Sequence, residues 1–184
     1  MKKKKSKRRR HQNSLIGGGY YSIFNNTPED TFELEEVFND FVPYAKDYLK
    51  FDKPVKIILD YPENVKDTFS PTGNYNPQNN TIVVFIQGRH PKDILRSLAH
   101  ELVHHSQNCH GMFSDESLMG DGAIEGYAQN NKHLRTMEEE AYKGSLMVRD
   151  FEDRKKSENK EINENNNDWE TQWNKFIKEK KNGR

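Results

Sequence analysis

Hydrophobic residues recur at helical spacing in the segment TPEDTFELEEVFNDF. Thr27 is suited to cap a helix, Pro28 suits the first helical position, and the acidic residues that follow favour the positive end of the helix dipole. We expect Pro43 to bend or interrupt this helix and YAKDYLKF to continue it. The apolar stripe of the helix comprises Phe32, Leu34, Val37, Phe38 and Phe41.

Two segments rich in branched residues predict β-strands. PVKIILDY (54–61) alternates apolar and polar positions, and TIVVFIQG (81–88) is a second strong strand. The intervening SPTGNYNPQNN has the proline, glycine and asparagine content of turns. Tyr75 is expected on a short strand that pairs with the second strand across the NPQNN turn. Together these segments predict a small antiparallel or mixed sheet.

After Gly88 the pattern changes from a period of two to a period of 3.6. Pro91 and Asp93 mark a helix start, and no residue breaks the helix before Gly111. Another helical pattern begins near Asn131. The apolar face of the first helix comprises Ile94, Leu95, Leu98, Leu102 and Val103, and that of the second Leu134, Met137, Ala141, Leu146 and Met147. A small sheet packed on these helices predicts an α+β fold.

The composition limits how much of the chain can form a core. Of 184 residues, 32% are hydrophobic and 32% are charged, and the mean hydropathy is −1.11, so one core built from all of them would be thin. The net charge of zero conceals an asymmetry. MKKKKSKRRR carries eight of the 29 basic residues and no acidic one, which leaves 21 basic against 29 acidic residues elsewhere. The pattern indicates a basic tail on an acidic domain.

These features divide the chain into four parts. Residues 1–25 combine the charge run with three consecutive glycines and are expected to form a flexible arm. Residues 26–153 form the domain, and 154–167 a polar linker. Residues 168–181 regain a helical pattern. Its apolar side is expected to pack against the domain of the same chain rather than against another chain. This side comprises Trp169, Trp173, Phe176 and Ile177.

The single cysteine and the absence of apolar runs bear on location. Cys109 can form no intramolecular disulfide, and a reducing, intracellular setting is the default. No apolar run approaches the roughly 20 residues that span a bilayer, and HQNSLIGGGYYS is not the apolar region of a signal peptide. We therefore expect a protein that is neither secreted nor inserted in a membrane.

The stretch LAHELVHHSQNCHG contains the pattern HExxH on the second half of a predicted helix. Residues four apart on a helix point in similar directions, so His100 and His104 can present two imidazole nitrogens to one ion. Glu101 projects beside them, near enough to accept a proton from a metal-bound water. Zinc suits such ligands and lowers the pKa of a bound water to about 7. The competing interpretation is a helix that carries this pattern by chance.

The order of strand, helix and HExxH resembles the zincin metallopeptidases. TIVVFIQGRHPKDILRSLAHELVHHSQN and HLRTMEEEAY resemble the small HExxH peptidases encoded by tailed bacteriophages, over roughly residues 28–153. The resemblance implies that His100 and His104 bind zinc, that Glu101 is the general base, and that residues 81–87 form a substrate-facing strand. It also implies a location in the host cytoplasm or in the virion.

The third zinc ligand has several candidates. His110 stands where the metzincin pattern HExxHxxGxxH has its third ligand, but Gln107 occupies the position of the required glycine. The gluzincin alternative takes a glutamate from a later helix. Glu138 is preferred because the small Ala141 follows it by three residues, which lets the two helices approach closely. Glu125 and Glu140 remain alternatives, and a solvated acidic face is the ordinary reading of EEEAY.

Zinc-dependent hydrolysis of a peptide or protein substrate is the function that this pattern favours. Candidates for stabilising the oxyanion are Tyr127, His133 and Tyr142. His105 is interpreted as a histidine on the flank of the helix, and Cys109 as a small buried hydrophobic residue. An alternative is a virion- or nucleic-acid-associated protein with an inactive zincin fold, because residues 2–10 can neutralise phosphates or contact another acidic surface. A third possibility is a zinc hydrolase that acts on another bond.

Overall fold

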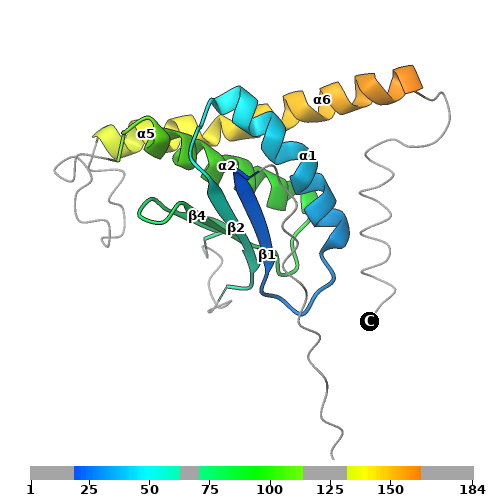
Figure 1. The fold of residues 1–184 in the computed structure, drawn as a ribbon, viewed down its shortest axis with the longest axis horizontal. Coiled ribbons are helices and arrows are strands. Elements are labelled where there is room, and N and C mark those ends of the chain that lie inside the picture. The colour runs from blue at the N-terminus through cyan, green and yellow to red at the C-terminus, as the bar shows by residue number, and fades with distance from the viewer. Residues whose placement is uncertain (1–18, 63–70, 114–131, 163–184) are drawn as a thin grey trace, which may run out of the picture.

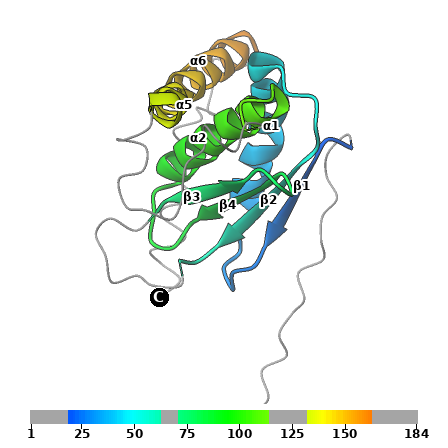
Figure 2. The same ribbon diagram turned by 90° about the vertical axis from the view of Figure 1, so that its left-hand side faces the viewer.

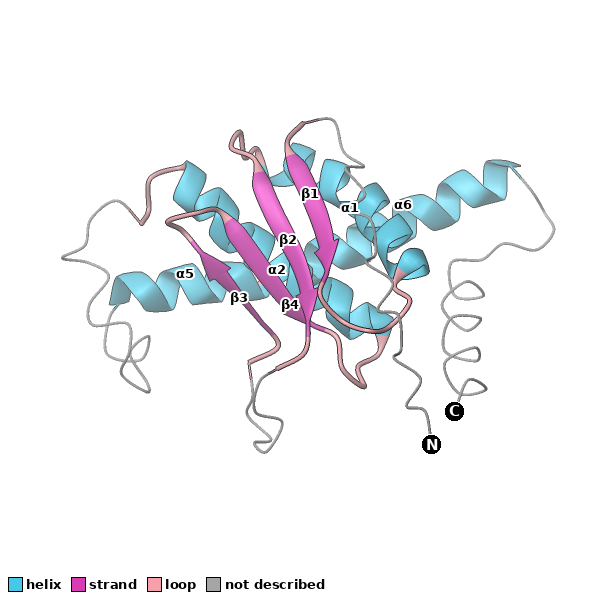
Figure 3. Ribbon diagram, turned by 60° about the horizontal axis from the view of Figure 1, so that its bottom comes forward, coloured by secondary structure: helices cyan, strands magenta, loops and turns pink. Residues whose placement is uncertain are grey.

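The computed structural model describes residues 19–62, 71–113 and 132–162. Its described helices cover one face of a mixed sheet, as Figures 1 and 2 show. Figure 3 looks onto the opposite face, which carries no helix among the described residues. The α+β class predicted from the sequence is confirmed. None of the described helices combines the length and apolar character needed to cross a membrane.

The described sheet has the strand order β1-β2-β4-β3. These strands are β1 (Tyr21–Asn25), β2 (Val55–Asp60), β4 (Thr81–Phe85) and β3 (Gly73–Asn76). β1 pairs in parallel with β2, β2 pairs in parallel with β4, and β3 pairs in antiparallel with β4. The strand predicted around Tyr75 is confirmed, and it forms the edge of the sheet beyond β4.

Two sequence expectations about the sheet require correction. The antiparallel alternative is wrong for β2 and β4, because the chain between them first forms β3 and reverses direction once more at the hairpin turn. The flexible arm was expected to extend through residue 25, but Tyr21–Asn25 forms β1 and pairs with β2 throughout. Residues 1–18 lie outside the described residues.

The first helix, α1 (Phe32–Leu49), begins later than the sequence predicted. The start at Thr27 and Pro28 is wrong, because the side chain of Asn25 organises a turn there. Its Oδ1 accepts hydrogen bonds from the backbone N–H and the hydroxyl of Thr27, and its Nδ2 donates to the hydroxyl of Thr31. Thr31 is the residue that precedes the helix.

Pro43 lies inside α1 and does not interrupt it. Proline has no N–H for the carbonyl of the residue four positions earlier, which here is Asn39. The hydroxyl of Tyr21 contacts this carbonyl at 3.4 Å and donates to Asn39 Oδ1 at 2.9 Å. A side chain of β1 therefore approaches the carbonyl oxygen to which Pro43 cannot donate a hydrogen bond.

The HExxH helix is α2 (Pro91–Cys109), as the sequence predicted. Pro91 is its first residue, and Gly111 adopts the left-handed conformation just beyond its end, with φ of 81°. The later helical segment forms two helices, α5 (Lys132–Tyr142) and α6 (Gly144–Ile162), divided at Lys143.

The end of α6 corrects the polar linker expected at 154–167, because the helix continues to Ile162. The expected helix at 168–181 lies outside the described residues.

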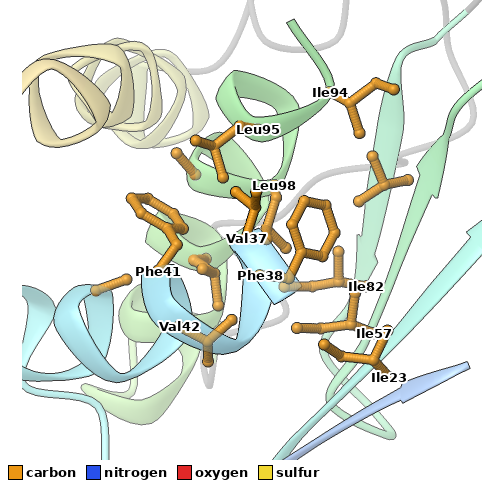
Figure 4. Packing of buried hydrophobic residues seen from close by; sticks show 14 of the residues in the cluster. Ile23, Val37, Phe38, Phe41, Val42, Ile57, Ile82, Ile94, Leu95 and Leu98 are labelled. Carbon is orange, nitrogen blue, oxygen red and sulfur yellow. The ribbon is translucent and has the colours of Figure 1, made fainter. Parts of the chain in front are cut away.

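The hydrophobic core lies between the sheet and the helices, with α2 at its centre. α2 contacts α1, α5, α6, β3 and β4. One row of the core crosses three strands in register, and comprises Ile23, Ile57 and Ile82. Figure 4 shows this row facing α1 and α2, whose side chains here include Phe38, Phe41, Leu95 and Leu98. Because one face of α2 is fixed in this core, the orientation of its other residues is fixed as well.

Candidate metal centre

The two histidines of HExxH converge on one side of α2. The Nε2 atoms of His100 and His104 lie 3.2 Å apart, with ring centroids separated by 4.8 Å. His104 is buried and His100 is partly buried. The helical spacing therefore does bring two imidazole nitrogens to one point, as the sequence predicted.

α5 brings the carboxylate of Glu138 to the same point. One of its oxygens lies 3.4 Å from Nε2 of His100 and the other lies 3.5 Å from Nε2 of His104. In a four-coordinate zinc site with bonds of about 2.0–2.1 Å, ligand atoms stand about 3.3 Å apart. The observed separations are close to this value, with each oxygen of Glu138 facing a different imidazole. Among the described residues, these three side chains form the group that could hold a metal ion.

Small residues allow α5 and α6 to approach α2 this closely. Ala141, three positions after Glu138, is fully buried. Gly144 lies against the backbone of α2, where an added Cβ would stand 3.0 Å from the carbonyl carbon and oxygen of Ala99 and 3.1 Å from the backbone nitrogen of His100. The predicted role of Ala141 in close packing is consistent with this arrangement, and Gly144 extends it by another three residues.

Glu101 lies against the edge strand β3. It is 7% exposed. Burial raises the pKa of its carboxyl group, and the nearby carboxylate of Glu138 adds to the rise, while His104 and His100 oppose it. An added Cβ at Gly73 on β3 would stand 3.2 Å from both Cγ and Oε1 of Glu101. The carboxyl group is therefore confined between α2 and β3.

Glu138 and the histidines of the cluster shift each other's pKa values. Contacts with His100 and His104 lower the pKa of Glu138 from 4.5 to about 2, against the opposing effect of burial. Burial disfavours the charged form of His104, but hydrogen bonds with Glu138 and Gln107 outweigh it and raise its pKa. These contacts therefore stabilise the ionised form of Glu138 and the protonated form of His104.

Gln107 joins the site to α5. Its side chain is buried, and its Oε1 lies 2.9 Å from Nδ1 of His104. Its Nε2 donates to the carbonyl of Met137 at 3.0 Å and to the carboxylate of Glu140 at 3.1 Å. The residue that breaks the metzincin pattern thus bridges a predicted ligand and the helix of another.

The described alternatives for a third ligand, His110 and Glu140, do not join the group. His110 is exposed at the end of α2, and its Nδ1 contacts the carbonyl of Ser106 at 2.8 Å. Glu140 accepts a hydrogen bond from Gln107. Glu125 lies outside the described residues.

Two of the candidates for stabilising an oxyanion are described. The ring of Tyr142 lies 5.2 Å from that of His100, and its side chain is largely exposed. His133 contacts the carbonyl of Met112 through Nε2 at 3.0 Å. Tyr127 lies outside the described residues.

His105 was expected on the flank of the helix, but it is fully buried in a hydrogen-bonded network. Its Nε2 lies 3.0 Å from the carbonyl of Lys53, and its Nδ1 lies 3.1 Å from the hydroxyl of Tyr75. Asn108 donates to the same hydroxyl and to the carbonyl of Pro77. This network attaches the hairpin of β3 and β4 to α2. Cys109 is partly buried beside His105, in agreement with a packing role.

Sequence reasoning missed two residues of the site, Gln107 and Gly73. Gln107 stands three residues after His104, a spacing at which helical side chains meet, and that spacing was an available signal. Gly73 is one glycine of a turn-rich segment, and its contact with Glu101 depends on the placement of β3 against α2.

Comparisons with protein-family models, with curated proteins and with solved structures found no match. Any functional assignment for this chain therefore depends on its own motif and on the geometry of this site.

Proposed function

We propose that the chain is a zinc-dependent peptidase of the gluzincin type, in which His100, His104 and Glu138 bind the ion and Glu101 is the general base. The observation that carries the proposal is the convergence of three side chains. The Nε2 atoms of His100 and His104 lie 3.2 Å apart, and the two oxygens of Glu138 lie 3.4 Å from the first and 3.5 Å from the second. Two imidazoles and one carboxylate are one of the ligand sets found in catalytic zinc sites. Glu101 adds a carboxyl group beside this set that is not a ligand. When bound, the ion would act as a Lewis acid and lower the pKa of water to about 7.

Glu101 supports a catalytic rather than a purely structural site. Its carboxyl group shares the turn of α2 that holds both histidines, and burial raises its pKa towards the range in which a general base operates. In the proposed reaction Glu101 accepts a proton from the attacking water and transfers it to the leaving amine. The contact with Gly73 holds the carboxyl group in place for both transfers.

The sheet offers a place for the substrate. The resemblance to zincins implied residues 81–87 as the substrate-facing strand, but β4 is paired on both sides, so this expectation is wrong. β3 is the edge strand of the described sheet and adjoins Glu101 through Gly73. We propose that an extended peptide pairs with the outer edge of β3, so that its backbone passes the site.

Metal content is the first test of the proposal. Elemental analysis of protein purified without a metal-affinity tag should find about one zinc ion per chain in the wild type, the count expected for a single site. His104→Ala removes a ligand and should contain little zinc. Equal and negligible metal in both proteins, even after incubation with zinc, would reject the site.

Peptide hydrolysis is the second test, with Glu101→Gln as the informative variant. The amide keeps the shape of the side chain but cannot accept the proton, so this variant should retain zinc and lose hydrolysis of a mixed peptide library. Full activity of Glu101→Gln would remove Glu101 from the mechanism. Zinc without turnover in the wild type would favour the virion- or nucleic-acid-associated alternative, and hydrolysis of non-peptide esters or amides alone would favour another zinc hydrolase.

A further inference from the structure

The amide of Gln107 has its orientation fixed by its neighbours. The carbonyl of Met137 and the carboxylate of Glu140 lie 3.0 and 3.1 Å from Nε2, and both groups accept hydrogen bonds. The NH₂ group must therefore face these two acceptors, because the amide oxygen has no proton to donate. It follows that Oε1 faces His104.

This orientation determines the tautomer of His104. Oε1 of Gln107 lies 2.9 Å from Nδ1 of His104 and can only accept a hydrogen bond, so Nδ1 carries the proton. In the neutral ring Nε2 is then unprotonated. Nε2 is the atom that lies near His100 and Glu138. Gln107 therefore presents the metal-binding nitrogen of His104 with its lone pair directed at the cluster.

The same amide restrains the helix of the third ligand. Met137, whose carbonyl accepts from Gln107, immediately precedes Glu138 on α5. The hydrogen bond thus ties the backbone next to one ligand to the side chain that orients another. Because Gln107 is 3% exposed, water cannot readily replace these hydrogen bonds when the side chain is changed.

We infer that Gln107 is a positioning residue, which holds His104 in its metal-binding tautomer and ties α5 to α2 at the height of Glu138. This inference rests on the proposed metal site. Groups that orient a metal ligand in this way change metal affinity by about 10- to 100-fold when removed. Gln107, which stands where the metzincin pattern requires glycine, would thereby support the ligands of a gluzincin site.

Zinc affinity tests the inference without reference to catalysis. Gln107→Leu keeps the size of the side chain and removes its hydrogen bonds, and should weaken zinc binding by about 10- to 100-fold in a competition assay with a chromogenic chelator. Glu140→Ala is the matched control, because it removes one partner of Gln107 and leaves the contact with His104. It should change zinc affinity by less than about threefold. Equal affinity of folded Gln107→Leu and wild type would overturn the inference.

The tautomer itself can be observed in the wild type, which removes any dependence on a variant that fails to fold. Long-range ¹⁵N–¹H NMR spectra at alkaline pH should place the proton of His104 on Nδ1, both before and after addition of zinc. A proton on Nε2 in the zinc-free protein would overturn the inference. A wild type that binds zinc, shows the Nδ1 proton and hydrolyses no peptide would refute the peptidase proposal and leave the role of Gln107 intact.

Discussion

Gly73 on β3 lies directly against Glu101 on α2. A Cβ at position 73 would stand 3.2 Å from Cγ and Oε1 of Glu101, and 3.0 Å from the carbonyl oxygen of Val83 on the neighbouring strand. The strand thus approaches the carboxyl group as closely as it does because the residue there has no side chain. The position of the Glu101 carboxyl group consequently depends on the position of β3.

Gly73→Ala should displace Glu101 without affecting the ligands. The added methyl group meets backbone on one side, so the movable carboxyl group has to yield. We expect peptide hydrolysis to fall by about 10- to 100-fold, since small displacements of a catalytic group have effects of this size. Zinc affinity should stay within about threefold of wild type, as the change contacts none of the ligands.

The matched control for this change is Asn74→Ala, on the same strand with an exposed side chain. It should retain nearly full activity. If Gly73→Ala were as active as the control, the position of Glu101 against β3 would have no catalytic importance.

The identity of the third ligand can be tested by comparing alanine variants. Glu138→Ala should lower zinc occupancy more than Glu125→Ala, Glu140→Ala or His110→Ala, because the carboxylate of Glu138 lies within 3.5 Å of both imidazoles. Elemental analysis after dialysis against a weak chelator would rank the four. A larger loss in Glu125→Ala or His110→Ala would reassign the third ligand.

Local pattern was sufficient to predict the helices that carry the proposed zinc ligands. His100 and His104 converge because a helix brings positions four apart to one side, and this follows from the motif alone. Glu138 could be preferred over Glu140 because only it has a small residue, Ala141, three positions later. The close approach of this helix to α2 could therefore be predicted from the small side chain of Ala141.

Relationships between distant segments could not be predicted in the same way. The strand β1 follows a glycine-rich, charged segment, and its pairing depends on β2, more than 30 positions further along. The start of α1 depended on the hydrogen bonds of Asn25, which compete with helix formation at Thr27. Gly73 reaches Glu101 only because β3 adds to the far side of β4.

Tyr75→Phe should destabilise the hairpin without altering the metal site. Nε2 of His105 contacts a carbonyl and therefore carries the proton, so Nδ1 accepts from the hydroxyl of Tyr75. The substitution leaves this buried nitrogen without its donor, whereas Nδ2 of Asn108 keeps the carbonyl of Pro77 as an acceptor. We expect the free energy of unfolding in urea to fall by about 1–3 kcal/mol.

Tyr48→Phe is the matched control for that measurement, because Tyr48 is 52% exposed. It should change the free energy of unfolding by less than about 0.5 kcal/mol. Zinc affinity should be unchanged in both variants. A loss of affinity in Tyr75→Phe alone would mean that the hairpin supports the ligands as well as Glu101.

Gly144→Ala should lower both stability and zinc affinity. Alanine ordinarily stabilises a helix relative to glycine by about 0.5–1 kcal/mol, but here the methyl group would meet the backbone at Ala99 and His100, which cannot move aside. We expect a net loss of about 1–3 kcal/mol in urea unfolding, as for an overfilled core. Zinc binding should weaken because α5, which ends two residues earlier, would move from α2. Lys143→Ala, at the exposed junction of α5 and α6, should change neither quantity appreciably.

The stability of the metal-free protein should depend on pH through Glu138. Its pKa is lowered from 4.5 to about 2 by contacts with His100 and His104. A carboxyl group whose pKa is lower in the folded protein stabilises the fold above its unfolded pKa, and this contribution disappears as pH falls from about 4.5 towards 2. Glu138→Gln lacks the contribution, so the difference in free energy of unfolding from wild type should narrow over that interval.

Glu139→Gln is the control, since Glu139 is exposed on the same helix and outside the ligand group. A constant difference between wild type and Glu138→Gln from pH 6 to pH 3 would show that Glu138 is not paired with the histidines in the metal-free protein.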